Sequence, residues 1–197
     1  MGIQERERKM HGPLRRAGLE VIPDAVPDGT MPWVGGYDIS DVVGGFSHPY
    51  ATPRLVERLN EDWYDLAVSV GLLDERREFL VLLPEVIRTH RSNASEPRAW
   101  TRVRLLDDWD IMGRGAASAF LGVRAGHPGF DMLALDSSVY VRCSTGEAGV
   151  DVLAVGHPHR SEHVVQHLER YATWEGAVTP YDREMRRRVA TWLATRA

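Results

Sequence analysis

The pattern of apolar and polar positions predicts a first helix over residues 53–70. Apolar residues recur there every three or four positions, which is the spacing of an amphipathic helix with one buried stripe. Thr52 and Pro53 are residues that helix starts favour, and Gly71 is expected to end the helix. The stripe consists of Leu55, Leu59, Trp63, Leu66 and Val70.

The next apolar segment, Phe79–Leu83, has two interpretations. Its five residues are apolar on every side, and Pro84 follows them directly. A helix over residues 75–91 would be kinked at Pro84, because proline lacks the N–H that a helix interior needs. A short buried strand followed by a helix after Pro84 fits the same residues. We expect the helix over residues 75–91.

Short alternating segments then predict a sheet between about residues 100 and 155. Turns of a few residues, rich in glycine, proline, serine and aspartate, separate these segments. Strands this closely spaced pair antiparallel, because parallel neighbours need a crossover of a dozen or more residues. We therefore expect an antiparallel meander with strands over residues 100–110, 120–123, 131–135, 139–143 and 150–155.

Two more amphipathic helices are predicted after the meander, over residues 161–174 and 180–195. Ser161 is a favourable N-cap for the first, and Thr179 followed by Pro180 starts the second. The apolar face of the first of these helices is expected to lie on the sheet. The predicted fold class is therefore α+β, an antiparallel meander packed by helices before and after it.

The amino-terminal quarter of the chain has a different character. Residues 1–17 are rich in charge and lack a wide apolar face, so we expect a flexible arm. Residues 18–50 are rich in glycine and proline but contain several aromatic and branched residues. We expect them to wrap over the core, with Ile39 and Val42–Val43 adding a short edge strand, so that residues 18–197 form one domain.

Composition narrows the classes of partner. The chain has 197 residues, 43% of them hydrophobic, and a net charge of −4, which favours neither nucleic acid nor a membrane as partner and leaves a basic protein open. Cys143 is the only cysteine, and the amino terminus is charged where a signal peptide would be apolar, so we expect a cytoplasmic protein. No cofactor is expected, because neither Gly35–Gly36 nor Gly44–Gly45 has the context of a phosphate-binding loop.

A histidine cluster spans His157–His167. His159 to His163 spells H-x-x-E-H, in which two imidazoles one helical turn apart hold zinc and the glutamate activates water. If Ser161 caps the helix, His159 precedes it and loses that geometry, while His163 and His167 remain one turn apart on its flank. We expect no metal site, and a site at His159, His163 and His167 is the alternative.

Three carboxylates surround a tryptophan just after the first strand of the predicted meander. Asp107, Asp108 and Asp110 flank Trp109, and an exposed tryptophan among acids has the composition of a protein interface. These four residues are the predicted partner-binding surface. We expect no catalytic residue, and Cys143 is most simply a small buried hydrophobe.

Several short patterns follow one another in a fixed order along the second half of the chain. They are Leu83-Pro84-Glu85 before a helix, Leu121-Gly122 in a strand, Asp136 to Val139-Tyr140 across a turn, and Ser161 at the start of a helix that reaches Tyr171. This order resembles the SUKH superfamily, which comprises α+β immunity and scaffold proteins of bacterial toxin systems. The resemblance covers roughly residues 83–174 and implies binding to a partner protein without catalysis.

Three functions follow as hypotheses. The first is a non-catalytic cytosolic interaction protein, of the kind of an immunity protein that binds a basic toxin or nuclease domain. The second is a small NTF2-like α+β barrel, an enzyme or ligand-binding protein with an aromatic pocket. The third is a metal hydrolase that uses the His157–His167 cluster. The pocket of the second hypothesis would be lined by Trp63, His90, Trp100 and Tyr140, with Trp109 beside them.

Overall fold

One antiparallel sheet of seven strands is the centre of the computed structural model, which describes residues 11–23, 26–32, 35–84, 98–176 and 179–195. The order of strands across the sheet is β1-β4-β3-β7-β8-β9-β2. In chain order they are β1 (Leu19–Val21), β2 (Val42–Pro49), β3 (Glu78–Pro84), β4 (Arg98–Leu105), β7 (Phe130–Leu133), β8 (Val139–Thr145) and β9 (Gly149–Gly156).

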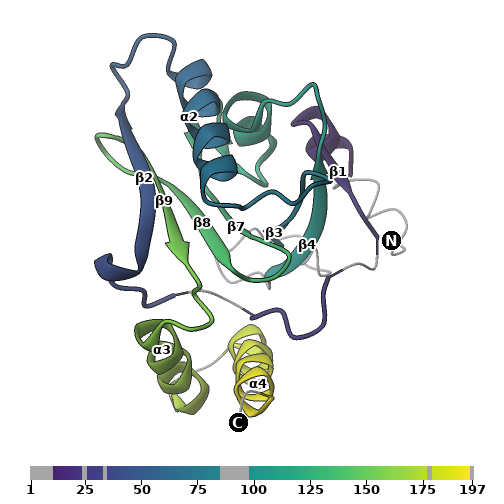
Figure 1. The fold of residues 1–197 in the computed structure, drawn as a ribbon, viewed down its shortest axis with the longest axis vertical. Coiled ribbons are helices and arrows are strands. Elements are labelled where there is room, and N and C mark those ends of the chain that lie inside the picture. Colours follow the sequence, from purple (N-terminus) through teal and green to yellow (C-terminus); the bar gives the residue numbers. More distant parts are fainter. Residues whose placement is uncertain (1–10, 24–25, 33–34, 85–97, 177–178, 196–197) are drawn as a thin grey trace.

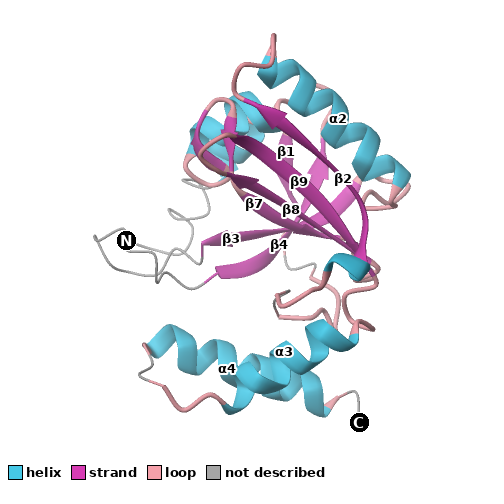
Figure 2. Cartoon of the chain, turned by 90° about the vertical axis from the view of Figure 1, so that its left-hand side faces the viewer, coloured by secondary structure: helices cyan, strands magenta, loops and turns pink. Residues whose placement is uncertain are grey.

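Helices cover both faces of this sheet, so the molecule has three layers (Figures 1 and 2). Helix α2 (Leu55–Ser69) packs on one face through Leu59, Trp63 and Ala67. Helices α3 (Glu162–Thr173) and α4 (Pro180–Ala194) pack on the other face. No helix of the described residues is long and apolar enough to cross a membrane.

Shorter elements complete the fold. Residues 11–16 are helical, and Leu14 and Ala17 beside them are fully buried, so the packed part of the chain begins before residue 18. The remaining short elements are η1 (Ile39–Asp41), the π-helical turn η2 (Ile111–Gly115), η3 (Ala116–Ser118), and a two-stranded hairpin of β5 (Gly122–Arg124) and β6 (His127–Pro128).

Strand β3 lies inside the sheet, between β4 and β7, where we expected part of a helix over residues 75–91. Phe79, Val81 and Leu83 belong to the core under α2, whereas Leu80 and Leu82 belong to the core under α3 and α4. Successive side chains of a strand point to opposite faces, so a strand covered on both faces is apolar at every position. The strand interpretation of Phe79–Leu83 is therefore the right one. Residues 85–91 of that prediction, including His90, lie outside the described residues.

The other predictions of secondary structure are largely confirmed. The α+β class, the meander of β7, β8 and β9, and the helices near 53–70, 161–174 and 180–195 are all present. Ser161 caps α3, where its Oγ accepts the N–H of Val164 at 3.3 Å, and Thr179 forms a capping box with Asp182 at the start of α4. The N-cap of α2 is Arg54, in a left-handed conformation, in place of the expected Thr52. The segment predicted over 120–123 forms the separate hairpin, and β4 ends at Leu105.

The wrap predicted over residues 18–50 supplies both edge strands of the sheet. Strand β1 pairs with β4 at one edge, and β2, longer than the edge strand expected near residue 42, pairs with β9 at the other. Between them the wrap crosses the α3–α4 face, where two buried indoles hold it. Trp100 of β4 donates a hydrogen bond to the carbonyl of Met31 at 2.7 Å, and Trp192 of α4 donates to the carbonyl of Gly29 at 3.0 Å.

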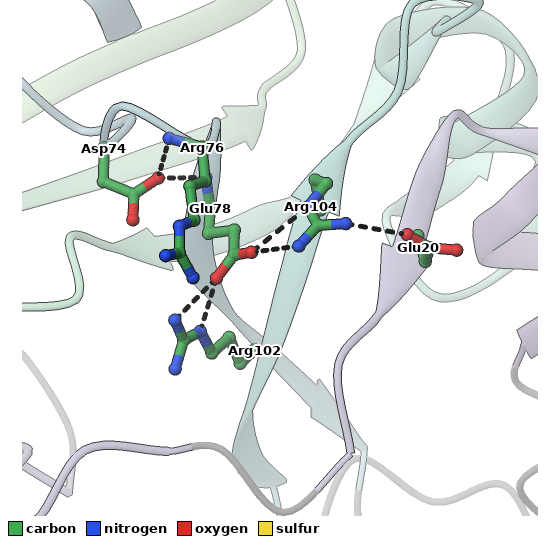
Figure 3. Close-up of polar contacts among 6 residues, drawn as sticks. All are labelled: Glu20, Asp74, Arg76, Glu78, Arg102 and Arg104. Carbon is green, nitrogen blue, oxygen red and sulfur yellow. Dashed lines mark hydrogen bonds and ion pairs between the residues drawn. The ribbon is translucent and has the colours of Figure 1, made fainter.

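A chain of four charges ties β1 and β4 to β3 (Figure 3). Glu78 is buried, with 2% of its surface exposed, and its two carboxylate oxygens bind Arg102 at 2.6 Å and Arg104 at 2.5 Å. Arg104 also reaches Glu20 of β1, at 3.4 Å. Desolvation alone would raise the pKa of Glu78, but hydrogen bonds from Arg104 and Arg102 outweigh it and lower that pKa below its ordinary value of 4.5.

We expect Glu78→Gln to lower the free energy of unfolding at pH 7 by about 2–3 kcal/mol, since it leaves two arginines without their carboxylate. Because the folded pKa of Glu78 is lowered, its contribution is complete above pH 4.5 and is lost as the pH falls through the folded value. Urea titrations from pH 7 to pH 3 should therefore show a smaller acid loss in the variant than in the wild type. Glu20→Gln, at the exposed end of the chain of charges, is the control and should cost less than about 1 kcal/mol. Equal losses in the two variants would contradict the role given to Glu78.

Candidate partner-binding surface

Trp109, the predicted anchor of the interface, is half-buried beside α2. Its ring makes an edge contact with Trp63, with centroids 5.4 Å apart, and stacks on Tyr64 at 5.5 Å. Gly18 holds the other side, because with a φ of +84° it lets the backbone approach the Cα of Trp109 more closely than a Cβ would allow. Trp109 therefore presents only part of its ring to solvent, from a fixed position.

Asp110 has a structural role that the sequence did not reveal. Its carboxylate accepts the N–H groups of Gly113 at 2.8 Å and Arg114 at 2.9 Å, and it also accepts the side-chain amide of Asn60 at 2.8 Å. Desolvation opposes these bonds, but they prevail and lower the pKa of Asp110. Asp110 thus caps η2 and fastens it to α2, which leaves its carboxylate engaged inside the protein.

Asp107 and Asp108 do face solvent, and each carries an arginine partner. Asp107 pairs with Arg77 at 2.8 Å, and Asp108 pairs with Arg114 at 2.7 Å. The hydrogen bond from Arg114, followed by its positive charge, lowers the pKa of Asp108. Exposed ion pairs of this kind contribute little to stability but cancel much of the local charge. The predicted acidic surface is therefore largely neutralised at these two positions.

The available carboxylates lie in a groove beside Trp109, and not at Asp107 and Asp108. The groove has a volume of about 680 Å³ and runs along the outer surface of α2, with Tyr64 and Trp109 as its aromatic part. Four carboxylates and one guanidinium line it, those of Glu57, Glu61, Asp62, Asp65 and Arg58. Of the four predicted interface residues, only Trp109 lines this groove.

Three of these carboxylates form a ridge along α2. Glu57, Glu61 and Asp65 are spaced by four residues, so they lie one above the other on the exposed side of the helix. No ion pair joins any of them to another of the described residues, whereas Asp62 binds His48 of β2 at 2.5 Å. Like charges at this spacing destabilise a helix by about 0.2–0.5 kcal/mol per pair, so the ridge carries a small cost to folding. The same spacing was visible in the polar face of the helix predicted over 53–70.

The histidine cluster does not form the zinc pattern. Ser161 caps α3, so His159 lies before the helix, where its Nδ1 bonds the carbonyl of Ser137 at 2.9 Å. The Nδ1 of His163 lies 3.4 Å from a carboxylate oxygen of Asp41. Partial burial lowers the pKa of His167. Within the described ranges, no three histidine, cysteine, aspartate or glutamate side chains are grouped to hold a metal ion.

The described residues among those proposed for an aromatic pocket do not meet. Trp63 is buried under α2, whereas Trp100 and Tyr140 lie in the core on the opposite face of the sheet. Tyr140 donates its hydroxyl hydrogen to Asp131, and burial, with the nearby carboxylate, raises its pKa well above the ordinary value. The sheet has β1 and β2 at its two edges, so it is open and does not close into a barrel. Cys143 is buried, which raises the pKa of its thiol and fits the predicted role of a small hydrophobe.

Comparisons with protein-family models, with curated proteins and with solved structures gave no significant match. The function is therefore inferred from the residues of the site itself.

We expect Asp110→Ala to lower the free energy of unfolding by about 1–2 kcal/mol, because the cap of η2 and the bond to Asn60 are both lost. Asp108→Ala, two residues away, removes only an exposed ion pair and should change stability far less than Asp110→Ala does. Urea unfolding of both variants measures the difference. Equal effects would show that Asp110 is an ordinary surface acid.

Proposed function

We propose that this protein is a non-catalytic interaction protein that binds the basic surface of a protein partner through the α2 groove. The observation that carries the proposal is the unpaired ridge of Glu57, Glu61 and Asp65 beside the fixed rings of Tyr64 and Trp109. Aromatic residues are enriched at the centre of protein interfaces, and unpaired carboxylates around them steer a basic partner during encounter. A surface of this composition supports association better than it supports chemistry.

The partner class follows from the charge of the groove. Carboxylates outnumber the guanidinium of Arg58 by four to one, so nucleic acid and anionic lipid would be repelled. The resemblance to the SUKH superfamily points to a bacterial toxin or nuclease domain as the basic partner, and the protein would act as its immunity protein. The lone thiol of Cys143 fits a reducing cytoplasm, where we place this function.

We expect that removal of the three negative charges of the ridge weakens the binding of the partner. Protein in which Glu57→Gln, Glu61→Gln and Asp65→Asn are combined should fold normally, since these side chains are exposed. Capture from an extract of the native cells, followed by surface plasmon resonance with the captured protein, should show at least tenfold weaker binding. The loss should lie mainly in the association rate and shrink at high salt.

A matched variant with Glu147→Gln, Asp151→Asn and Glu169→Gln removes the same charge from exposed positions outside the groove and should bind as the wild type does. Capture of an acidic partner, or equal weakening by the two triple variants, would overturn the proposal. A steady turnover of a small substrate by the purified protein would also contradict it.

A further inference from the structure

A second cleft, of about 600 Å³, opens on the other side of the sheet, next to the end of α4. Four parts of the chain that are distant in sequence line it. They are residues 27–31 of the wrap, residues 135–137 of the turn between β7 and β8, His159, and Trp192 with Thr195 from α4. The α2 groove is on the opposite face of the sheet, so this cleft is independent of the proposed function.

The carboxylates of Asp28 and Asp136 line this cleft, and no lysine or arginine is among the described residues of its lining. Arg188, one helical turn before Trp192, is held by Glu184 at 2.9 Å. Desolvation would raise the pKa of Asp136, but hydrogen bonds from Ser138 outweigh this and lower it, so the carboxylate is ionised at neutral pH.

Hydrogen-bond acceptors add to the two carboxylates. Helix α4 ends at Ala194, and its C-cap residue Thr195 lines the cleft, so the negative end of the helix dipole faces the same space. The Nδ1 of His159 lies 2.9 Å from the carbonyl of Ser137 and donates to it, because a carbonyl oxygen only accepts; in the neutral imidazole, Nε2 is then an acceptor. The described part of the lining therefore offers several acceptors and no lysine or arginine.

The walls of the cleft are fixed before any ligand arrives. Trp192 anchors the carbonyl of Gly29, and the N–H of Ser138 binds the carboxylate of Asp136 at 2.9 Å. The turn that carries Asp136 is closed by a second bond, from the N–H of Ser137 to the carbonyl of Ala134 at 2.9 Å. Pre-organised acceptors do not lose conformational freedom on binding, so more of their attraction appears as affinity.

We propose that this cleft binds a ligand bearing a guanidinium or alkylammonium group, held between Asp28 and Asp136. A guanidinium donates five hydrogen bonds and an ammonium three, which matches a site made of acceptors. A partly apolar floor, which includes Met31, Leu135 and Trp192, accommodates the carbon chain of such a ligand. A bare metal ion is a poorer fit, because no three metal-ligating side chains converge among the described residues.

Agmatine, which has a guanidinium at one end of a short chain and an ammonium at the other, is the probe. Titration of the full chain, followed by the indole N–H resonance of Trp192 in ¹⁵N-resolved NMR, measures both affinity and place. We expect the Trp192 resonance to shift in a saturable way while that of Trp63, buried on the other face, stays fixed. N-butylurea, which is similar in shape but uncharged, should produce no saturable shift.

Asp28→Asn and Asp136→Asn should each weaken agmatine binding about five- to tenfold, and asparagine at position 136 keeps an oxygen that can accept the N–H of Ser138. Asp65→Asn on α2 removes the same charge outside the cleft and should leave the affinity unchanged. The inference is overturned if agmatine produces no saturable shift at millimolar concentration, if N-butylurea binds equally well, or if Asp65→Asn weakens binding as much as the cleft variants do. Each of these results leaves the partner-binding test of the α2 ridge unaffected.

Discussion

The burial of β3 on both faces determines the architecture of the protein. Its five consecutive apolar residues place side chains on both sides of the sheet, and both sides must be removed from water. Burial of one large apolar side chain contributes about 1.5–3 kcal/mol, so neither face can be left open. Helix α2 covers one face, and α3 and α4 cover the other, which gives the three layers.

The covering of the second face depends on the wrap as well as on the helices. Residues 26–32 lie in the α3–α4 layer, and their carbonyls receive the indole N–H groups of Trp100 and Trp192. A buried indole needs a partner for its N–H, so these two bonds satisfy the tryptophans and fix the wrap at once. The same arrangement forms one wall of the cleft at the end of α4. At the β1 edge of the sheet, the ion pairs that run from Glu20 to Arg102 hold β1, β4 and β3 together.

The two candidate binding regions are both acidic, but one is a helix surface and the other is a cleft. Along α2 the carboxylates of Glu57, Glu61 and Asp65 project from a helix surface, so they can meet a broad basic surface. At the end of α4 the carboxylates of Asp28 and Asp136 border a cleft of limited size, so they suit a single cationic group. In both regions these carboxylates form no ion pair with another described residue, whereas Asp107 and Asp108 are paired with arginines. Ion pairing with neighbouring arginines, and not the net charge of the chain, therefore determines which carboxylates are available to a ligand or partner.

The sequence by itself determined the elements whose signals are local. Periodicity of about 3.6 residues predicted α2, α3 and α4, the short turns predicted the meander of β7, β8 and β9, and Ser161 marked where α3 begins. Tertiary structure decided three further points. It made Phe79–Leu83 a strand, because a uniformly apolar run has no period and only its two covering layers distinguish strand from helix. Asp110 points inward, because its carboxylate accepts hydrogen bonds from the N–H groups of η2 and from the side-chain amide of Asn60. Tertiary structure also brought Asp28 and Asp136 to one cleft, although more than a hundred residues separate them, since the wrap and the β7–β8 turn meet only after the sheet and α4 have packed.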